Sequence, residues 1–107
     1  MTMNPARAGN YPLRRRAVVA GLLKGRDDLL VVAGLGAAAW DCTAAGDRDL
    51  TFPLWGGMGG AASIGLGLAL AQPKRRVLVI TGDGEMLMGL GSLATVAAQS
   101  PGNLAIV

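Results

Sequence analysis

The amino-acid sequence predicts an α/β domain in which a parallel sheet is flanked by helices. Short apolar runs alternate with segments of helical length, and this alternation is typical of a parallel sheet with right-handed crossovers. The run from Leu29 to Ala33 is apolar at every position, as expected of a strand that is buried on both faces. Glycine-rich turns follow three of the apolar runs, where such a sheet opens its ligand crevice.

The expected elements follow one another in a regular order. Residues 1–12 carry Pro, Asn, Gly and Arg without periodicity, so we expect a loose tail followed by one domain over 13–107. Apolar residues recur at helical spacing within 13–23 and predict a first helix there. After the strand at 29–33 we expect a turn and helix over 34–45, a strand at 51–54, a helix at 59–71, a strand at 77–81, a helix at 89–99 and a strand at 103–107.

The helix expected over 59–71 has no polar face. A helix that is apolar all round must be covered on several sides. We expect the sheet to cover one side and a partner domain to cover another.

Composition excludes several classes of function. The 107 residues include no histidine, which removes Ser-His and Cys-His nucleophiles and disfavours a zinc site. The single cysteine, Cys42, rules out an internal disulfide, so we predict a buried thiol in a reducing, cytoplasmic setting.

The formal net charge of +3 arises mainly from two clusters, Arg14–Arg16 and Lys74–Arg76. No aromatic residues are interleaved with them, so we expect no nucleic-acid partner and interpret both clusters as solvated helix ends and turns. The positive field could still attract an acidic substrate or a diphosphate.

An uncharged stretch over residues 50–73 has the Gly-xxx-Gly spacing of some membrane helices. Pro53 and two glycine pairs interrupt it near its start. The remaining residues, 61–71, are too few to span a bilayer, so we expect no membrane partner.

The most informative motif is Gly82-Asp83-Gly84-Glu85, which directly follows the apolar run at 77–81. Glycines on both sides of an acid let the backbone approach an anion without a Cβ in the way. Asp83 offers a hard oxygen ligand, and Mg²⁺ takes few protein ligands when diphosphate oxygens and water complete its shell. The motif is therefore typical of a metal–diphosphate pair, although an ordinary strand-to-helix turn uses the same residues.

The flanking segments give this motif its context. Trp55-Gly56-Gly57-Met58-Gly59-Gly60 opens the apolar helix upstream, and Met86-Leu87-Met88-Gly89-Leu90-Gly91 lies downstream. Their order and spacing over about residues 13–107 resemble the cofactor-binding half of thiamine diphosphate enzymes. The resemblance looks closest to the small β subunit of the sulfopyruvate and phosphonopyruvate decarboxylase group.

The resemblance implies a thiamine diphosphate-binding fold and a role for each motif residue. Asp83 would be the Mg²⁺ ligand, and Gly82, Gly84 and Glu85 would lie beside the diphosphate. It further implies that Gly56 and Gly57 hold the aminopyrimidine, that Met58 bends the cofactor into its V shape, and that the backbone of Gly34 and Gly36 meets the other end of the diphosphate.

Two departures from the family pattern matter. The family's metal motif continues with an Asn some two dozen residues or more after the Asp, and this chain stops at Val107, so we expect a chain that lacks its C-terminal part. The loop after the first strand carries Ala37, Ala38 and Ala39 in place of polar residues, which leaves only its backbone to donate hydrogen bonds.

The resemblance also implies an enzyme that works with a second polypeptide. The family's activating glutamate lies on a pyrimidine-binding domain, so we expect an α-type partner subunit and a hetero-oligomer. The implied reaction is decarboxylation of a small 2-oxo acid, with the present chain inactive alone and without a catalytic residue of its own. Glu85 is not assigned that role, because it lies on the diphosphate side.

Two rival functions remain open. Gly34-Leu35-Gly36-Ala37-Ala38-Ala39 matches a loose Gly-x-Gly-x-x-Ala fingerprint of dinucleotide-binding domains, but Asp47 and Asp49 come too early for the ribose-binding acid. A noncatalytic fragment, whose glycine-rich helix only packs, would leave the Gly82–Glu85 motif without a purpose.

Overall fold

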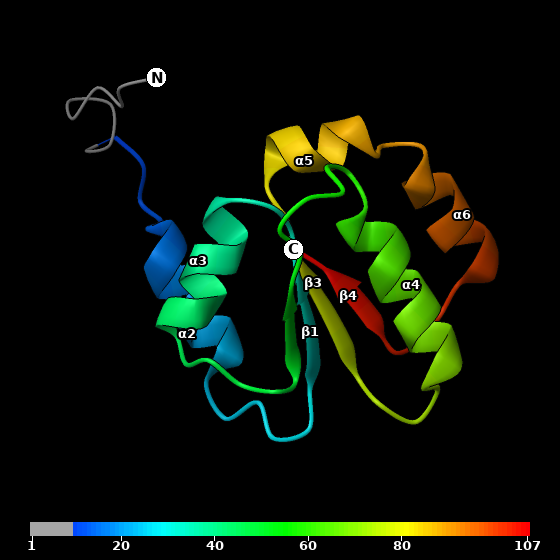
Figure 1. Cartoon of the computed structure of the whole chain (residues 1–107), viewed down its shortest axis with the longest axis horizontal. Coiled ribbons are helices and arrows are strands. Elements are labelled where there is room, and N and C mark those ends of the chain that lie inside the picture. The colour runs from blue at the N-terminus through cyan, green and yellow to red at the C-terminus, as the bar shows by residue number, and fades with distance from the viewer. Residues whose placement is uncertain (1–9) are drawn as a thin grey trace.

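A computed structural model describes residues 10–107, and these residues place a four-stranded sheet between helices (Figure 1). The strands are β1 (Leu30–Ala33), β2 (Thr51–Pro53), β3 (Val77–Ile80) and β4 (Leu104–Ile106). They lie in the order β2-β1-β3-β4, and every neighbouring pair is parallel. The predicted parallel α/β fold is confirmed, whereas the expected tail at 1–12 lies mostly outside the described residues.

Helices cover both faces of the sheet. They are α2 (Arg15–Leu23), α3 (Ala37–Ala44), α4 (Ala61–Ala71), α5 (Asp83–Met88) and α6 (Ser92–Gln99). Helices α2 and α3 lie on one side and α4 on the other, with α6 packed against α4 (Figure 1). Among the described residues, no helix has the length and apolar character needed to cross a membrane.

The element bounds agree with expectation to within a few residues, except at α5. We expected the next helix at 89–99, yet a separate six-residue helix begins at Asp83 and ends before Gly89. The acidic first turn of α5 is favourable there, because Asp83 and Glu85 meet the positive end of the helix dipole. This short helix lies over the carboxyl ends of the strands (Figure 1).

Alternate strand residues supply two apolar cores. Val31, Ala33, Leu78 and Ile80 pack with α2 and α3, and the buried thiol of Cys42 joins them as predicted. Val32 and Val79 pack on the opposite face against Ala61 of α4. A strand buried on both faces needs an uninterrupted apolar run, which explains the sequence of β1 and β3.

Helix α4 lies unusually close to the sheet. A Cβ added at Gly65 would lie 2.2 Å from Cγ2 of Val79, so only glycine allows this approach. The helix buries one face, including Ala62 and Leu66, and leaves Ile64 and Leu70 exposed. At its C-terminal end, Nδ2 of Asn103 donates to the carbonyls of Ala69 (3.0 Å), Gln72 (3.1 Å) and Arg75 (2.8 Å).

The first arginine cluster is not simply solvated, which corrects our interpretation. Arg15 and Arg16 of α2 both pair with Asp41 of α3, whose side chain is completely buried. Burial opposes ionisation of Asp41, but the hydrogen bonds and charges of the two arginines outweigh it and lower its pKa. The ion pairs tie α2 to α3, a contact between distant segments that local sequence patterns did not predict.

Candidate functional site at the carboxyl edge

The loops that follow β1, β2 and β3 all lie at the carboxyl edge of the sheet. The chain passes from β1 to β2 on one side and returns to β3 on the other, so the order reverses between β1 and β3. Open parallel sheets bind their ligands at such a switch point. Gly34 lies in this position, since its amide donates to the carbonyl of Ile80 at 2.7 Å.

Asp83 begins α5 three residues after Ile80, the last residue of β3, and its side chain is exposed. Its Oδ1 accepts a hydrogen bond from the amide of Gly84 at 2.8 Å. This local bond orients the carboxylate at the mouth of the switch point. The structure therefore places the predicted metal ligand at the predicted edge.

Neither backbone conformation nor packing within the chain requires glycine at positions 82 and 84. Neither Gly82 nor Gly84 has a positive φ, and a Cβ added at either position would meet no atom within 4 Å. Gly36 also borders open space, but its φ of +83° makes glycine necessary on conformational grounds. Bare backbone beside an exposed carboxylate is suited to the close approach of an anion.

The loop between β2 and α4 depends on glycine for its shape. Gly56, Gly57 and Gly59 have φ values of +151°, +55° and +90°, which side-chain-bearing residues rarely adopt. This path leaves Met58 exposed at the same edge as Asp83. The three glycine turns that the sequence singled out are thus brought to one edge.

Glu85 differs from Asp83 in that its carboxylate is bound internally. Oε1 accepts from the amides of Gly59 (2.9 Å) and Ala61 (3.3 Å), and Oε2 accepts from the hydroxyl of Thr81. A Cβ on Gly34 would lie 2.8 Å from Oε2, so Gly34 leaves the space that this carboxylate fills. Sequence reasoning missed these partners, because a glutamate two residues after an exposed acid shows no local sign of where it points.

Two tryptophans border the same edge. Trp40 of α3 and Trp55 of the β2–α4 loop have ring centroids 5.1 Å apart and planes at 70°, which is an edge-to-face pair. Both rings remain exposed. Trp55 is therefore available to report on a ligand that enters near Met58.

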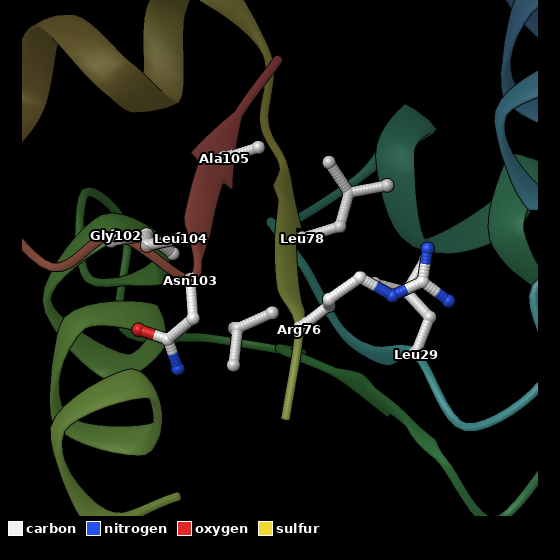
Figure 2. A pocket seen from close by; sticks show the side chains of 8 residues that line it. Leu29, Arg76, Leu78, Gly102, Asn103, Leu104 and Ala105 are labelled. Carbon is white, nitrogen blue, oxygen red and sulfur yellow. The ribbon is translucent and has the colours of Figure 1, made fainter. Parts of the chain in front are cut away.

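A hollow of about 300 Å³ lies elsewhere, toward the amino ends of β3 and β4. Figure 2 shows the side chains of Leu78 and Ala105, which are register partners, on the same side of the sheet within it. Leu29 and Arg76 also line it. None of the predicted site residues contributes to this hollow, so we do not assign the cofactor to it.

Comparison with known proteins identifies the family to which the loops at the carboxyl edge belong. Residues 34–107 match the family described as thiamine pyrophosphate enzyme, C-terminal TPP binding domain. The match spans the Gly34 turn, the Gly56–Gly60 loop and the Asp83 turn. This chain belongs to the thiamine pyrophosphate enzymes. The resemblance inferred from the sequence is confirmed.

Three relatives show which members of the family this chain is similar to. The chain is 53% identical over 81 residues to sulfopyruvate decarboxylase subunit beta of Methanothermobacter thermautotrophicus, covering 76% of this chain and 43% of that protein. It is 42% identical over 78 residues to the same subunit of Methanocaldococcus jannaschii, covering 73% and 41%. It is 45% identical over 100 residues to phosphonopyruvate decarboxylase of Streptomyces viridochromogenes, covering 94% and 25%. The chain thus spans less than half the length of each.

The family assignment weakens the dinucleotide alternative, and so does the structure. The turn at Gly34–Gly36 does lead directly into α3, as a fingerprint would. However, β2 ends at Pro53 and is followed by Leu54 and Trp55, so no acid occupies the end of the second strand. The family match also leaves little support for a noncatalytic packing fragment.

The charged groups at the edge fit a single-carboxylate metal site. Within residues 10–107, no three acidic or sulfur ligands converge as a self-sufficient metal cluster. Asp83 faces solvent, whereas Glu85 is held by internal donors. One free carboxylate beside bare backbone fits a magnesium ion that takes most of its ligands from a diphosphate and water.

Proposed function

We propose that this chain anchors the diphosphate and Mg²⁺ of thiamine diphosphate in a 2-oxo acid decarboxylase. The observation that carries the proposal is the convergence of Asp83 with the Gly56–Met58 loop at the β1/β3 switch point. In this arrangement Asp83 binds the metal, and the backbone of Gly82, Gly84 and Glu85 lies beside the diphosphate. Gly34 and Gly36 supply backbone at its other end.

The β2–α4 loop takes the other part of the cofactor. We assign the carbonyl of Gly56 to the 4′-amino group, Gly57 to the aminopyrimidine surface, and the exposed Met58 side chain to the bend of the cofactor. When bound, the cofactor would supply the nucleophilic carbon and the electron sink that decarboxylation of a 2-oxo acid requires. The chain's own residues orient it, and no described residue is assigned a proton-transfer role.

The relatives suggest the substrate class. Sulfopyruvate and phosphonopyruvate are both 2-oxo acids with a second, strongly acidic group, and the names of the relatives point to them. A net charge of +3 favours the approach of such anions. We therefore propose a sulfopyruvate- or phosphonopyruvate-type substrate. We also propose a cytoplasmic location, because the single cysteine, Cys42, is a free thiol, as expected in a reducing compartment.

We further propose that activity requires a pyrimidine-binding, α-type subunit. Both sulfopyruvate decarboxylase relatives described above are named as beta subunits, which implies a partner for those proteins. Large apolar side chains are exposed on the segments around the carboxyl edge, as expected of a surface that another chain covers: Trp55, Met58, Leu87, Met88 and Leu90.

Gly60 and Ala61, at the start of α4, are unsuitable positions for a variant that tests this interface. Ala61 is completely buried in the core, and a Cβ on Gly60 would lie 2.9 Å from the carbonyl oxygen of Gly57. Bulky residues at these two positions would disturb the domain itself and would not test the interface. Leu87→Asp is a better variant, because Leu87 is exposed on α5.

The test is Mg²⁺-dependent binding of thiamine diphosphate by the full protein in its native assembly. Asp83→Ala should abolish this binding while the far-UV circular dichroism spectrum is retained, because the metal loses its charged anchor. Asp47→Ala is the matched control, since Asp47 is an exposed carboxylate before β2. Retained affinity in Asp83→Ala on calorimetric titration would show that Asp83 is only a turn residue.

A further inference from the structure

The carboxylate of Glu85 connects all three loops at the carboxyl edge. It fills the space next to Gly34 after β1. It also accepts hydrogen bonds from the amides of Gly59 and Ala61 after β2 and from the hydroxyl of Thr81 after β3. We propose that Glu85 is a positioning residue that holds the Gly56–Met58 loop in register with Asp83. The proposal rests on the proposed function for what the two loops bind.

The chain order makes this coupling direct. Glu85 lies two residues after Asp83 on the same short helix, and Gly59 directly follows Met58. A segment of three residues within α5 thus carries both the proposed metal ligand and the anchor for the loop at the other end of the cofactor. A shift of the anchor changes the separation between the two ends of the site.

The chemistry of the contact suits a fixed anchor. Ala61 is the first residue of α4, and amides at the start of a helix have no acceptor within the helix. A carboxylate satisfies these amides and is favoured by the positive end of the helix. Such charge-assisted hydrogen bonds are stronger than those between neutral groups.

A second contact from the same helix restrains Gly59. Gly89 directly follows α5, and a Cβ on Gly89 would lie only 1.9 Å from the carbonyl oxygen of Gly59. The two backbones are therefore in direct contact. Gly59 is therefore held by the Glu85 carboxylate in the first turn of α5 and by the Gly89 backbone after the last turn of α5.

Positioning and simple electrostatics predict opposite results. A glutamate close to a bound diphosphate would repel it, so its removal on electrostatic grounds alone should strengthen binding of the anion. If Glu85 positions the loop, its removal should weaken binding of a ligand that spans both loops. The variants Glu85→Ala and Glu85→Gln separate the two effects, because both remove the charge but they differ in the hydrogen bonds that they keep.

Only Glu85→Gln preserves the contacts. Its amide oxygen can accept from Gly59 and Ala61, and its amide nitrogen can donate to the hydroxyl oxygen of Thr81. Glu85→Ala removes every acceptor. In cofactor-free protein, we expect hydrogen exchange of the Gly59 and Ala61 amides to accelerate at least about tenfold in Glu85→Ala and to stay near wild type in Glu85→Gln. Unchanged exchange in Glu85→Ala would overturn the proposal.

Gly34→Ala provides a second route if Glu85→Ala does not fold. Its new Cβ would lie 2.8 Å from Oε2 and 3.2 Å from the Thr81 hydroxyl oxygen, so the carboxylate must move. We expect faster exchange at Gly59 and Ala61, some 25 residues away in sequence. Wild-type exchange rates in this variant would also count against the proposal.

The binding test compares two ligands in the full protein and its native assembly. In the proposed arrangement, magnesium pyrophosphate contacts Asp83 and the Gly34–Gly36 turn but not the Gly56–Met58 loop, whereas thiamine diphosphate with Mg²⁺ contacts all three. Glu85→Ala should weaken binding of thiamine diphosphate at least about tenfold, the cost of losing a preorganised loop, and should weaken binding of pyrophosphate by no more than about twofold. Glu85→Gln should retain wild-type selectivity between the ligands.

The outcomes are distinguishable. Equal weakening of both ligands in Glu85→Ala would indicate general damage to the fold, and tighter binding of both would indicate simple repulsion; either result refutes positioning. If the wild-type protein binds no thiamine diphosphate, the proposed function fails. The exchange measurement still decides whether Glu85 holds the loop.

Discussion

Replacing Gly65 with alanine should fail to stabilise the domain, although this substitution ordinarily strengthens a helix. In a helix interior, alanine is more favourable than glycine by about 1 kcal/mol. At Gly65, however, the new Cβ would lie 2.2 Å from Cγ2 of Val79. Ordinary carbon contacts begin near 3.5 Å, so α4 or β3 must move by more than about 1 Å.

Val79 cannot easily give way. It is completely buried at the centre of β3, and its branched side chain is stiff about χ1. Overpacking of this kind costs about 1–3 kcal/mol. The cost equals or exceeds the gain in helix propensity, so we expect Gly65→Ala to range from neutral to about 2 kcal/mol destabilising.

Gly67→Ala is the matched control in the same helix. A Cβ at Gly67 meets no atom within 4 Å, so only the propensity gain of about 1 kcal/mol remains. Urea unfolding followed by tryptophan fluorescence should place the midpoint of Gly67→Ala above wild type and that of Gly65→Ala at or below it, with similar m values. If Gly65→Ala proved as stable as Gly67→Ala, the close contact between α4 and β3 would be wrong.

Three further predictions concern the ion pair and the site. Asp41→Asn should lower the free energy of unfolding by about 1.5–3 kcal/mol at neutral pH, the usual worth of hydrogen bonds to a charged group. Because the pKa of Asp41 is lowered in the folded state, the stabilisation by its carboxylate is present above the unfolded pKa of about 3.9 and is lost as pH falls through the folded value. The acid-denaturation curves of wild type and variant should therefore converge at low pH. Met58→Ala should leave Mg²⁺-dependent cofactor affinity largely intact and lower the turnover number, because a shortened side chain no longer enforces the bend; an unaltered turnover number would remove Met58 from the site. Thiamine diphosphate should quench tryptophan fluorescence only when Mg²⁺ is present. Trp55→Phe should remove most of this quenching, whereas Trp40→Phe should not. Quenching that persists without the metal would contradict the proposed binding of Mg²⁺ by Asp83.

Periodicity and glycine placement were sufficient to predict the parallel sheet, the alternation of its strands and helices apart from α5, and the edge that carries the candidate site. The apolar runs at Leu30–Ala33 and Val77–Ile80 are short and uninterrupted, and this pattern depends only on burial of both strand faces. Asp83 was recognisable as a candidate metal ligand because its two flanking glycines and its place after a strand are all local features.

Contacts between distant segments decided the rest. No local pattern distinguishes Arg15 and Arg16, which pair with buried Asp41, from ordinary surface arginines. Likewise, Glu85 and Gly59 are 26 residues apart, and their hydrogen bond exists only because β2 and β3 both lie next to β1 and direct their loops to one edge. Local sequence determines which residues can be buried or can turn, because those properties depend on single side chains and backbone angles. Which carboxylate faces solvent and which holds a loop depends on donors that only the packed sheet and helices bring within reach.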